Sequence, residues 1–237
     1  MRKLVSIATA AVLFSATSAF AEESGVFLGA EIGYANAKFE NKLSAVGLSE
    51  SAKYDGGGVK YGIVVGYKQF FTQYLGLRYY ANVGIAHATI KSNSVADAYG
   101  WKDRVDGTLI NYGANVDFLG NFVSNETLDF GGFIGLGIGG NSWNGRDLDD
   151  HEDYLNGLAG GGISLSKTSF DLSLNVGLRA NIATHHGIEL VAKVPFLETK
   201  LLDKTVSTTL NGQNANVNVK NTLHSPFNIT ARYTFSF

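Results

Sequence analysis

The hydrophobic pattern of this chain repeats with a period of two, and no other feature limits the fold as strongly. In residues 170–182, for example, Phe, Leu, Val, Ala and Ile alternate with Asp, Ser, Asn, Gly and Arg. Successive side chains of a β-strand point to opposite faces, so each such segment is predicted to be a strand with one apolar face. The eight segments with this pattern are residues 26–35, 60–68, 75–85, 110–118, 128–138, 170–182, 188–196 and 227–237.

The length of the segments separates two classes of β protein. Strands of about ten residues suit a tilted crossing of a bilayer, whereas strands of soluble sheets more often have about five or six residues. The centre of the apolar face has no Asp, Glu, Lys or Arg in any of the eight segments, as contact with lipid requires. The sequence therefore predicts an all-β fold, an eight-stranded antiparallel transmembrane up-and-down β-barrel.

The linkers between the segments support this fold because they alternate between short and long. Short turns on the periplasmic side, long outer loops and an even number of strands are typical of bacterial outer-membrane barrels. The short linkers are residues 70–74, 119–127 and 183–186, and the long, polar ones are residues 39–58, 91–106, 141–169 and 197–226. Within the third long linker, residues 154–167 alternate briefly, which leaves an extra hairpin strand open.

Nearly all the charged residues of the strands lie on the face opposite the apolar one. An eight-stranded barrel is so narrow that side chains fill its interior, and charges enclosed there are costly unless they are paired. Five acids and six bases therefore predict an ion-pair network across the lumen that acts as a structural plug rather than a selective pore. The predicted members are Glu31, Lys60, Lys68, Arg78, Asp117, Asp129, Asp171, Arg179, Glu189, Lys193 and Arg232.

Residues 1–21 have the three parts of a secretory signal peptide. A basic start and an apolar stretch lead to an A-x-A cleavage site formed by Ala19 and Ala21. We therefore expect export, with removal of residues 1–21 and a single barrel domain over residues 22–237.

Aromatic residues gather at the predicted strand ends, where the girdles of outer-membrane barrels lie. The expected periplasmic girdle is Phe27, Phe70, Phe71, Tyr74, Phe118, Phe122, Phe130 and Phe237. The expected outer girdle is Tyr34, Phe39, Tyr61, Phe170, Phe196 and Phe227.

Two parts of the sequence resemble known outer-membrane proteins. The last strand, with Tyr233, Phe235 and Phe237, is similar to the C-terminal β-signal read by the barrel-assembly machinery. An N-x-G-x-R-x-N strand at residues 175–181, then H-G-I-E at residues 186–189 and K-V-P at residues 193–195, resembles the Helicobacter/Campylobacter-type outer membrane protein family. The resemblance implies a C-terminal barrel in a family with both adhesins and pores. The adhesins are typically longer and often contain cysteine, unlike this chain.

The composition excludes several other classes. The chain has no Cys, which rules out disulfide scaffolds and cysteine-based zinc sites. A formal net charge of −2 makes a nucleic-acid partner a poor expectation. The acidic run at residues 147–153 lacks the spacing and turn glycine of a calcium loop and is interpreted as a solvated surface. No motif indicates a cofactor or a metal site.

An enzymatic role is the remote alternative. His87 lies near Ser92 and Ser94 at the top of the third segment, where a lipid-modifying barrel would hold its catalytic groups, but no base with an orienting partner is visible. We therefore expect a non-enzymatic surface protein with four long outer loops. A narrow pore for small solutes and a loop-mediated adhesin remain alternatives. The expected partners are outer-membrane lipid, the assembly machinery and a surface ligand of the loops.

Overall fold

The computed structural model describes residues 22–45, 48–91, 104–159, 161–210 and 213–237. These residues form antiparallel strands in one sheet and one helix, α2 (Arg146–Ala159). The strands are β1 (Gly25–Ala45), β2 (Leu48–Phe70), β3 (Leu75–Lys91), β4 (Arg104–Ser124), β5 (Leu128–Asn144), β6 (Thr168–Ile182), β7 (His186–Pro195), β8 (Thr199–Leu210), β9 (Gln213–His224) and β10 (Asn228–Ser236). The predicted leader, with Ala19 and Ala21, lies outside the described residues, as do Ser92 and Ser94.

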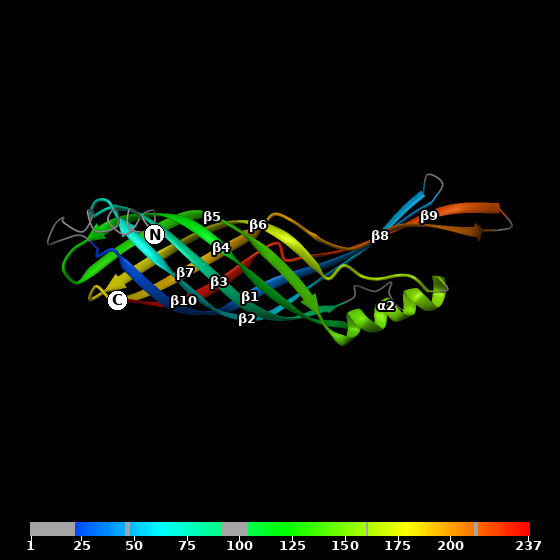
Figure 1. Cartoon of the computed structure of the whole chain (residues 1–237), viewed down its shortest axis with the longest axis horizontal. Coiled ribbons are helices and arrows are strands. Elements are labelled where there is room, and N and C mark those ends of the chain that lie inside the picture. Colours follow the sequence, from blue (N-terminus) through cyan, green and yellow to red (C-terminus); the bar gives the residue numbers. More distant parts are fainter. Residues whose placement is uncertain (1–21, 46–47, 92–103, 160, 211–212) are drawn as a thin grey trace, which may run out of the picture.

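Eight of the strands close into a barrel, which confirms the predicted fold class. Strands β1 to β7 pair in chain order, β7 pairs with β10, and β10 returns to β1 (Figure 1). Closure leaves the ring without an open edge. The remaining strands, β8 and β9, form a hairpin that joins the sheet beside the upper part of β1.

The two ends of the barrel differ. At one end, called the turn end, β2, β4 and β6 are linked to the following strands by the short turns 71–74, 125–127 and 183–185. In the last of these turns, Ala183 and Thr184 adopt positive φ angles of 50° and 68°. At the other end, called the hairpin end, the β1–β2 and β8–β9 hairpins and α2 project beyond the ring (Figure 1). The alternation of short and long connections is therefore present.

The long connections are more ordered than the predicted polar loops. Strands β1 and β2 continue through most of residues 39–58, and β8 and β9 occupy most of residues 197–226. The alternative of an extra strand at residues 154–167 is wrong for the described part of this segment, because α2 extends to Ala159 and β6 begins only at Thr168. The segment after the helix only touches the sheet, with Ser166 N donating to Leu201 O at 2.8 Å.

Burial alternates along the ring strands as the period of two predicts. Ile32, Ile134 and Leu190 are 62, 54 and 54% exposed, whereas the residues that precede them, Glu31, Phe133 and Glu189, are buried. Such a belt of exposed apolar side chains requires lipid around it, because water would not tolerate so large a patch.

Three expected girdle residues are exceptions. Phe27 and Phe39 are only 2 and 5% exposed and point inward. Phe70 packs partly buried against Leu119, Phe133 and Val191, with the Arg179 guanidinium 5.5 Å from the centre of its ring.

An arginine in place of Ile134 is expected to destabilise the barrel by about 2–4 kcal/mol, because it sets a charge in the exposed apolar belt at mid-strand. The measurement is urea unfolding in lipid vesicles, followed by the heat-modifiable electrophoretic migration of the folded barrel. Ser49→Arg, at an exposed position of the hairpin end, is the control and should shift the free energy of unfolding by less than about 0.5 kcal/mol. Equal tolerance of both changes would contradict the assignment of the lipid-facing belt.

Candidate functional site: the closed interior of the barrel

The interior of the barrel gathers the charged residues expected there. Ten of the eleven predicted residues are 0–7% exposed, and Lys193 is half-buried. Eight of them form ion pairs, in two groups at different depths. The others, Asp129, Asp171 and Lys193, make no ion pair within 4 Å among the described residues. One carboxylate oxygen of Asp171, Oδ1, is buried without a hydrogen-bond partner.

The central group runs across six strands as an unbroken series of ion pairs. Arg78 donates to Asp117 Oδ2 from Nη2 at 2.7 Å and also binds Glu189. Arg232 lies 3.3 Å from Glu189 and donates to Glu31 Oε2 from Nη2 at 2.8 Å. Arg78 is on β3 and Glu189 on β7, which lie on opposite sides of the ring, so their contact bridges the lumen.

Strand register explains why these charges meet. Glu31 is directly opposite Arg232, and Arg232 is directly opposite Glu189, so one row crosses β1, β10 and β7. Arg78 and Asp117 are likewise opposite each other on β3 and β4. Side chains directly opposite in an antiparallel pair share a face, and each acid is therefore placed beside a base.

The second group, nearer the turn end, contains a residue that sequence reasoning missed. Glu22 is buried and lies 2.8 Å from the Lys68 ammonium, and its carboxylate also binds Arg179, with Nη1 at 2.7 Å from Oε2. Glu22 precedes β1, so the period of two carries no information about its direction. The one available signal was the charge balance, since five predicted acids faced six predicted bases.

Neutral polar side chains fill the next layer toward the hairpin end. Asn82 donates to Asn111 at 3.1 Å and Asn111 donates to Asn141 at 2.9 Å, while Asn115 and Asn175 continue the series at 2.8 and 3.0 Å. All of these side chains are buried. Because each amide has a partner, this layer is well satisfied without water.

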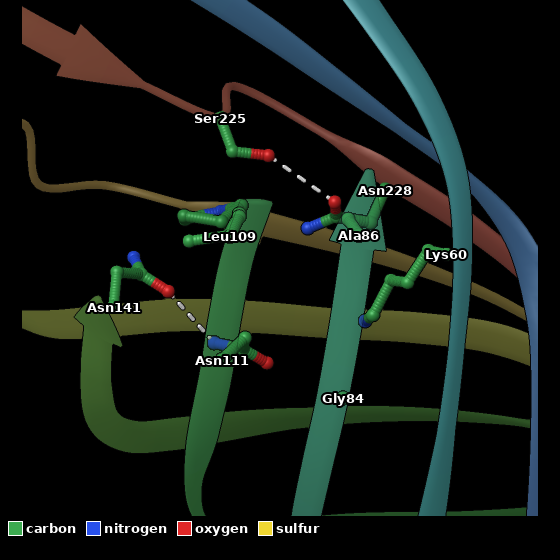
Figure 2. A pocket seen from close by; sticks show the side chains of 9 residues that line it. Lys60, Gly84, Ala86, Leu109, Asn111, Asn141, Ser225 and Asn228 are labelled. Atoms are coloured by element: carbon green, nitrogen blue, oxygen red, sulfur yellow. Dashed lines mark hydrogen bonds between the residues drawn. The ribbon is translucent and has the colours of Figure 1, made fainter. Parts of the chain in front are cut away.

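Little free space remains between these layers. A cavity beside Glu31, Lys60 and Arg232 has a volume of about 10 Å³, enough for one water molecule at most. Nearer the hairpin end, Figure 2 shows the point where the polar layer meets apolar side chains, with Asn111 and Asn141 below Ala86 and Leu109. The space between these side chains is too small to hold a water molecule.

An apolar core closes the hairpin end beyond the asparagine layer. Its centre is Trp143 on β5, 2% exposed, packed with residues from the wall strands, the β8–β9 hairpin and α2. The core members are Ala35, Ala37, Phe39, Tyr54, Ala86, Ala88, Ile90, Leu109, Trp143, Leu148, Leu165, Leu201, Leu202 and Leu223. Trp143 therefore packs in an apolar core that lies above the lumen.

Helix α2 covers one side of this core. Leu148 and His151 lie on its inner face, and the acidic run at residues 147–153 is part of the helix rather than a loop. His151 Nε2 lies 3.0 Å from the Asn221 amide, and its ring meets Phe39 edge-on at 6.4 Å. Lys167 binds Asp149 and Glu152 of the outer face. Within the described residues, no cluster of three or more His, Asp or Glu could hold a metal ion.

The packing of α2 is expected to weaken in acid. Burial lowers the pKa of His151 to about 4, below the ordinary value of about 6.5 that it regains when α2 detaches. The detached state binds the proton more readily, so the stability from this packing is complete above about pH 6.5 and falls as the pH drops toward 4. Amide hydrogen exchange of α2, corrected for intrinsic rates, should speed up between pH 7 and pH 5. His151→Gln should remove this pH dependence, and its persistence would contradict the assignment to His151.

The C-terminal strand presents its aromatic side chains at the turn end. Tyr233 and Phe237 are 47 and 73% exposed, and the rings of Phe235 and Phe237 pack edge-on at 5.2 Å. His185 stacks on Phe235 at 5.8 Å, and His186 Nδ1 lies 2.7 Å from the Tyr233 hydroxyl. The side chains of the predicted assembly signal therefore pack against His185 and His186 of the last turn.

The remaining candidate residue, His87, is bound to hydroxyl groups. Its Nε2 lies 3.0 Å from Tyr61 Oη and its Nδ1 lies 3.2 Å from Thr108 Oγ1.

Among the described residues, no helix is long and apolar enough to cross a bilayer.

Comparisons with known proteins agree with the barrel and its sequence motifs. The crystal structure of the outer membrane protein OprG from Pseudomonas aeruginosa is similar with a TM-score of 0.53 and 13% identity, covering 92% of this chain and 98% of that one. Neisserial surface protein A (NspA) is similar with a TM-score of 0.38 and 15% identity, covering 91% of this chain and 100% of that one. No curated protein sequence matches.

The family assignment rests on the sequence rather than on these structures, because at 13% identity the likeness to OprG shows the fold alone. The model of the family described as Helicobacter outer membrane protein matches residues 62–237, which include both groups of predicted motifs. The chain therefore belongs to the Helicobacter outer membrane protein family and is a β-barrel of the outer membrane.

Proposed function

We propose that this protein is a non-enzymatic surface protein whose closed barrel anchors the hairpin end and presents it outside the cell. The observation that carries the proposal is the double closure of the interior. Paired charges fill the lumen at mid-barrel, and an apolar core around Trp143 fills it at the hairpin end. Such a barrel serves as a rigid mount for the hairpins and α2.

The charge arrangement favours a closed barrel over a pore. Selective pores are lined by charges of one sign around an open path. Here Arg78 and Glu189 join opposite walls, and the guanidinium of Arg78 lies 5.1 Å from the centre of the Tyr80 ring and 4.7 Å from that of Phe133. A solute would have to break these contacts to pass.

The surroundings of His87 and His151 favour a non-enzymatic role. A histidine that acts as a general base is usually oriented by a carboxylate or a carbonyl group. His87 instead contacts the hydroxyls of Tyr61 and Thr108, and His151 is packed between α2 and the core.

The partners proposed for this function are lipid, the assembly machinery and a ligand of the hairpin end. The exposed belt supports lipid contact, and the exposed Phe237 beside Phe235 supports recognition of the last strand during assembly. The exposed outer face of α2, with Asp149, Asp150 and Asp153, offers an acidic surface for a ligand.

Cysteine labelling in intact cells tests the proposed orientation. The chain has no cysteine, so a single introduced thiol gives an unambiguous signal. Asp153→Cys, exposed on α2, should react with a membrane-impermeant maleimide, whereas Glu126→Cys, exposed in a turn at the other end, should react only after the outer membrane is permeabilised. The reverse pattern would overturn the proposal that the hairpin end lies outside.

A further inference from the structure

Beyond the ring, the outward face of the sheet changes from apolar to charged, and its described lysines outnumber its carboxylates. Strands β2, β1, β9 and β8 continue in this order as a four-stranded extension. On β1, Ile32 and Tyr34 point outward in the exposed belt, and the alternation places Lys38 and Lys42 on the same outward side. The basic surface is therefore a direct continuation of the lipid-facing surface.

Three lysines on this face, called here the lysine triad, lie on three adjacent strands. Lys42 on β1 is directly opposite Lys220 on β9. Lys200 on β8 is opposite Thr222, which follows Lys220 by two residues on β9, so the register places Lys200 diagonally beside Lys220. Like charges directly opposite each other destabilise a sheet. The triad thus holds an unfavourable pairing in a chain whose net charge is −2.

The nearby carboxylates are engaged elsewhere. Asp55 lies 3.4 Å from Lys38, and Glu40 lies 3.8 Å from Lys53. Asp203, opposite Lys220, accepts a hydrogen bond from the Asn218 amide at 3.3 Å. Within the described residues, no ion pair joins a member of the triad to a carboxylate. The three ammonium groups therefore form a cluster of like charge without a direct ion pair, and the one carboxylate directly opposite a member of the triad among the described residues is that of Asp203.

We propose that the lysine triad binds the phosphate groups of outer-leaflet lipid headgroups, an inference that rests on the orientation proposed above. Lys42 lies eight residues beyond Tyr34, which corresponds to about 26 Å along the strand. The distance between them along the membrane normal is shorter, because barrel strands are tilted. This is the depth of a phosphorylated sugar headgroup rather than of the acyl chains. The sideways direction of the face, shared with the lipid-facing belt, favours a membrane lipid over a polyanion from solution.

Binding of lipopolysaccharide to the folded, detergent-solubilised protein tests the proposal. Native mass spectrometry would compare intact lipopolysaccharide with the same lipid after enzymatic removal of its phosphates. The triple variant Lys42→Gln, Lys200→Gln, Lys220→Gln should bind the intact lipid about 100-fold more weakly, since each lysine near a charged lipid surface contributes roughly one factor of five. Wild-type protein should lose a similar part of its affinity for the dephosphorylated lipid.

A matched pair of single variants controls for the loss of charge alone. Lys220→Gln should weaken binding, whereas Lys204→Gln, on the opposite face of the same hairpin, should leave binding unchanged. Lys204 is opposite Val219, which packs against the core, and its ammonium donates to Gly162 O at 2.9 Å. Each variant should show the same heat-modifiable migration as the wild-type protein, which shows that it is folded.

Several outcomes would overturn the proposal. They are equal binding by the triple variant, equal binding of the dephosphorylated lipid, full competition by inorganic phosphate at millimolar concentration, and stronger binding of heparin than of the lipid. The last would identify a soluble sulfated polysaccharide as the ligand. Labelling of Asp153→Cys in intact cells is independent of these results, so failure of lipid binding and failure of the proposed orientation are distinguishable.

Discussion

Replacement of Glu189 with alanine is expected to lower the free energy of unfolding of the barrel by about 3–5 kcal/mol. Among the residues that the structure describes, Glu189 is the one carboxylate that contacts both Arg78 and Arg232. It is 4% exposed, so both guanidinium groups would remain buried after its carboxylate is removed. The two guanidinium groups would then share less negative charge inside a narrow, largely dry lumen, and the bridge between opposite walls would be lost.

Urea unfolding in lipid vesicles, followed by heat-modifiable migration, measures this effect. The matched control is Glu40→Ala, which removes an exposed carboxylate 3.8 Å from Lys53. Exposed ion pairs contribute little, so the control should cost no more than about 1 kcal/mol. If Glu189→Ala were as mild as Glu40→Ala, the central ion pairs would not hold the barrel walls together.

Replacement of Trp143 with alanine is expected to destabilise the hairpin end by about 3–5 kcal/mol. The indole is 2% exposed and is opposite Leu109 in the β4–β5 pair, so its removal leaves a cavity at the centre of the apolar core. The wall strands below are held by their own hydrogen bonds and ion pairs. The expected result is therefore a loosened hairpin end on an intact ring.

Hydrogen exchange resolves these two regions in one experiment. In Trp143→Ala, amides of α2 and of the upper parts of β4 and β5 should exchange faster, while those near Glu189 should keep their protection. Leu43→Ala, at a 37% exposed position near the far end of β1, is the control and should change little. Uniform acceleration over the whole barrel would show that the core and the ring unfold as one unit.

Much of the ring could be predicted because lipid and lumen impose opposite chemistry on alternate residues. A one-residue slip would place Arg179 in lipid, so the facing of each strand is strongly determined. The same rule predicted which charges enter the lumen. It could not predict which of them pair, because contacts such as Arg78 with Glu189 depend on strands far apart in the ring.

The predictions that were wrong or incomplete concern residues whose placement was not taken from the period of two. Phe27 and Phe39 were expected in the aromatic girdles, although both are in phase with Glu31 on the inward face of β1. The acidic run hid α2, since the helix is marked only by Leu148, His151 and Leu155 at spacings of three and four. The β8–β9 hairpin has few apolar residues, so its strand pattern is weak in the sequence.

Different interactions close the lumen and the hairpin end. The lumen is held by ion pairs and amide hydrogen bonds, whose partners are fixed by strand register. The hairpin end is held by burial of apolar side chains, as in a small soluble domain. We therefore expect α2 and the hairpins to respond to pH or to a mutation while the barrel remains closed.

The conductance of the purified protein in a planar lipid bilayer tests the closed barrel most directly. We predict no stable unitary current for the wild-type protein at neutral pH, because ion pairs cross the lumen and the apolar core covers it. Brief, irregular openings in Glu189→Ala would agree with this account, since that change removes the bridge between opposite walls. Large, stable unitary currents from the wild-type protein would contradict it and identify the barrel as a pore.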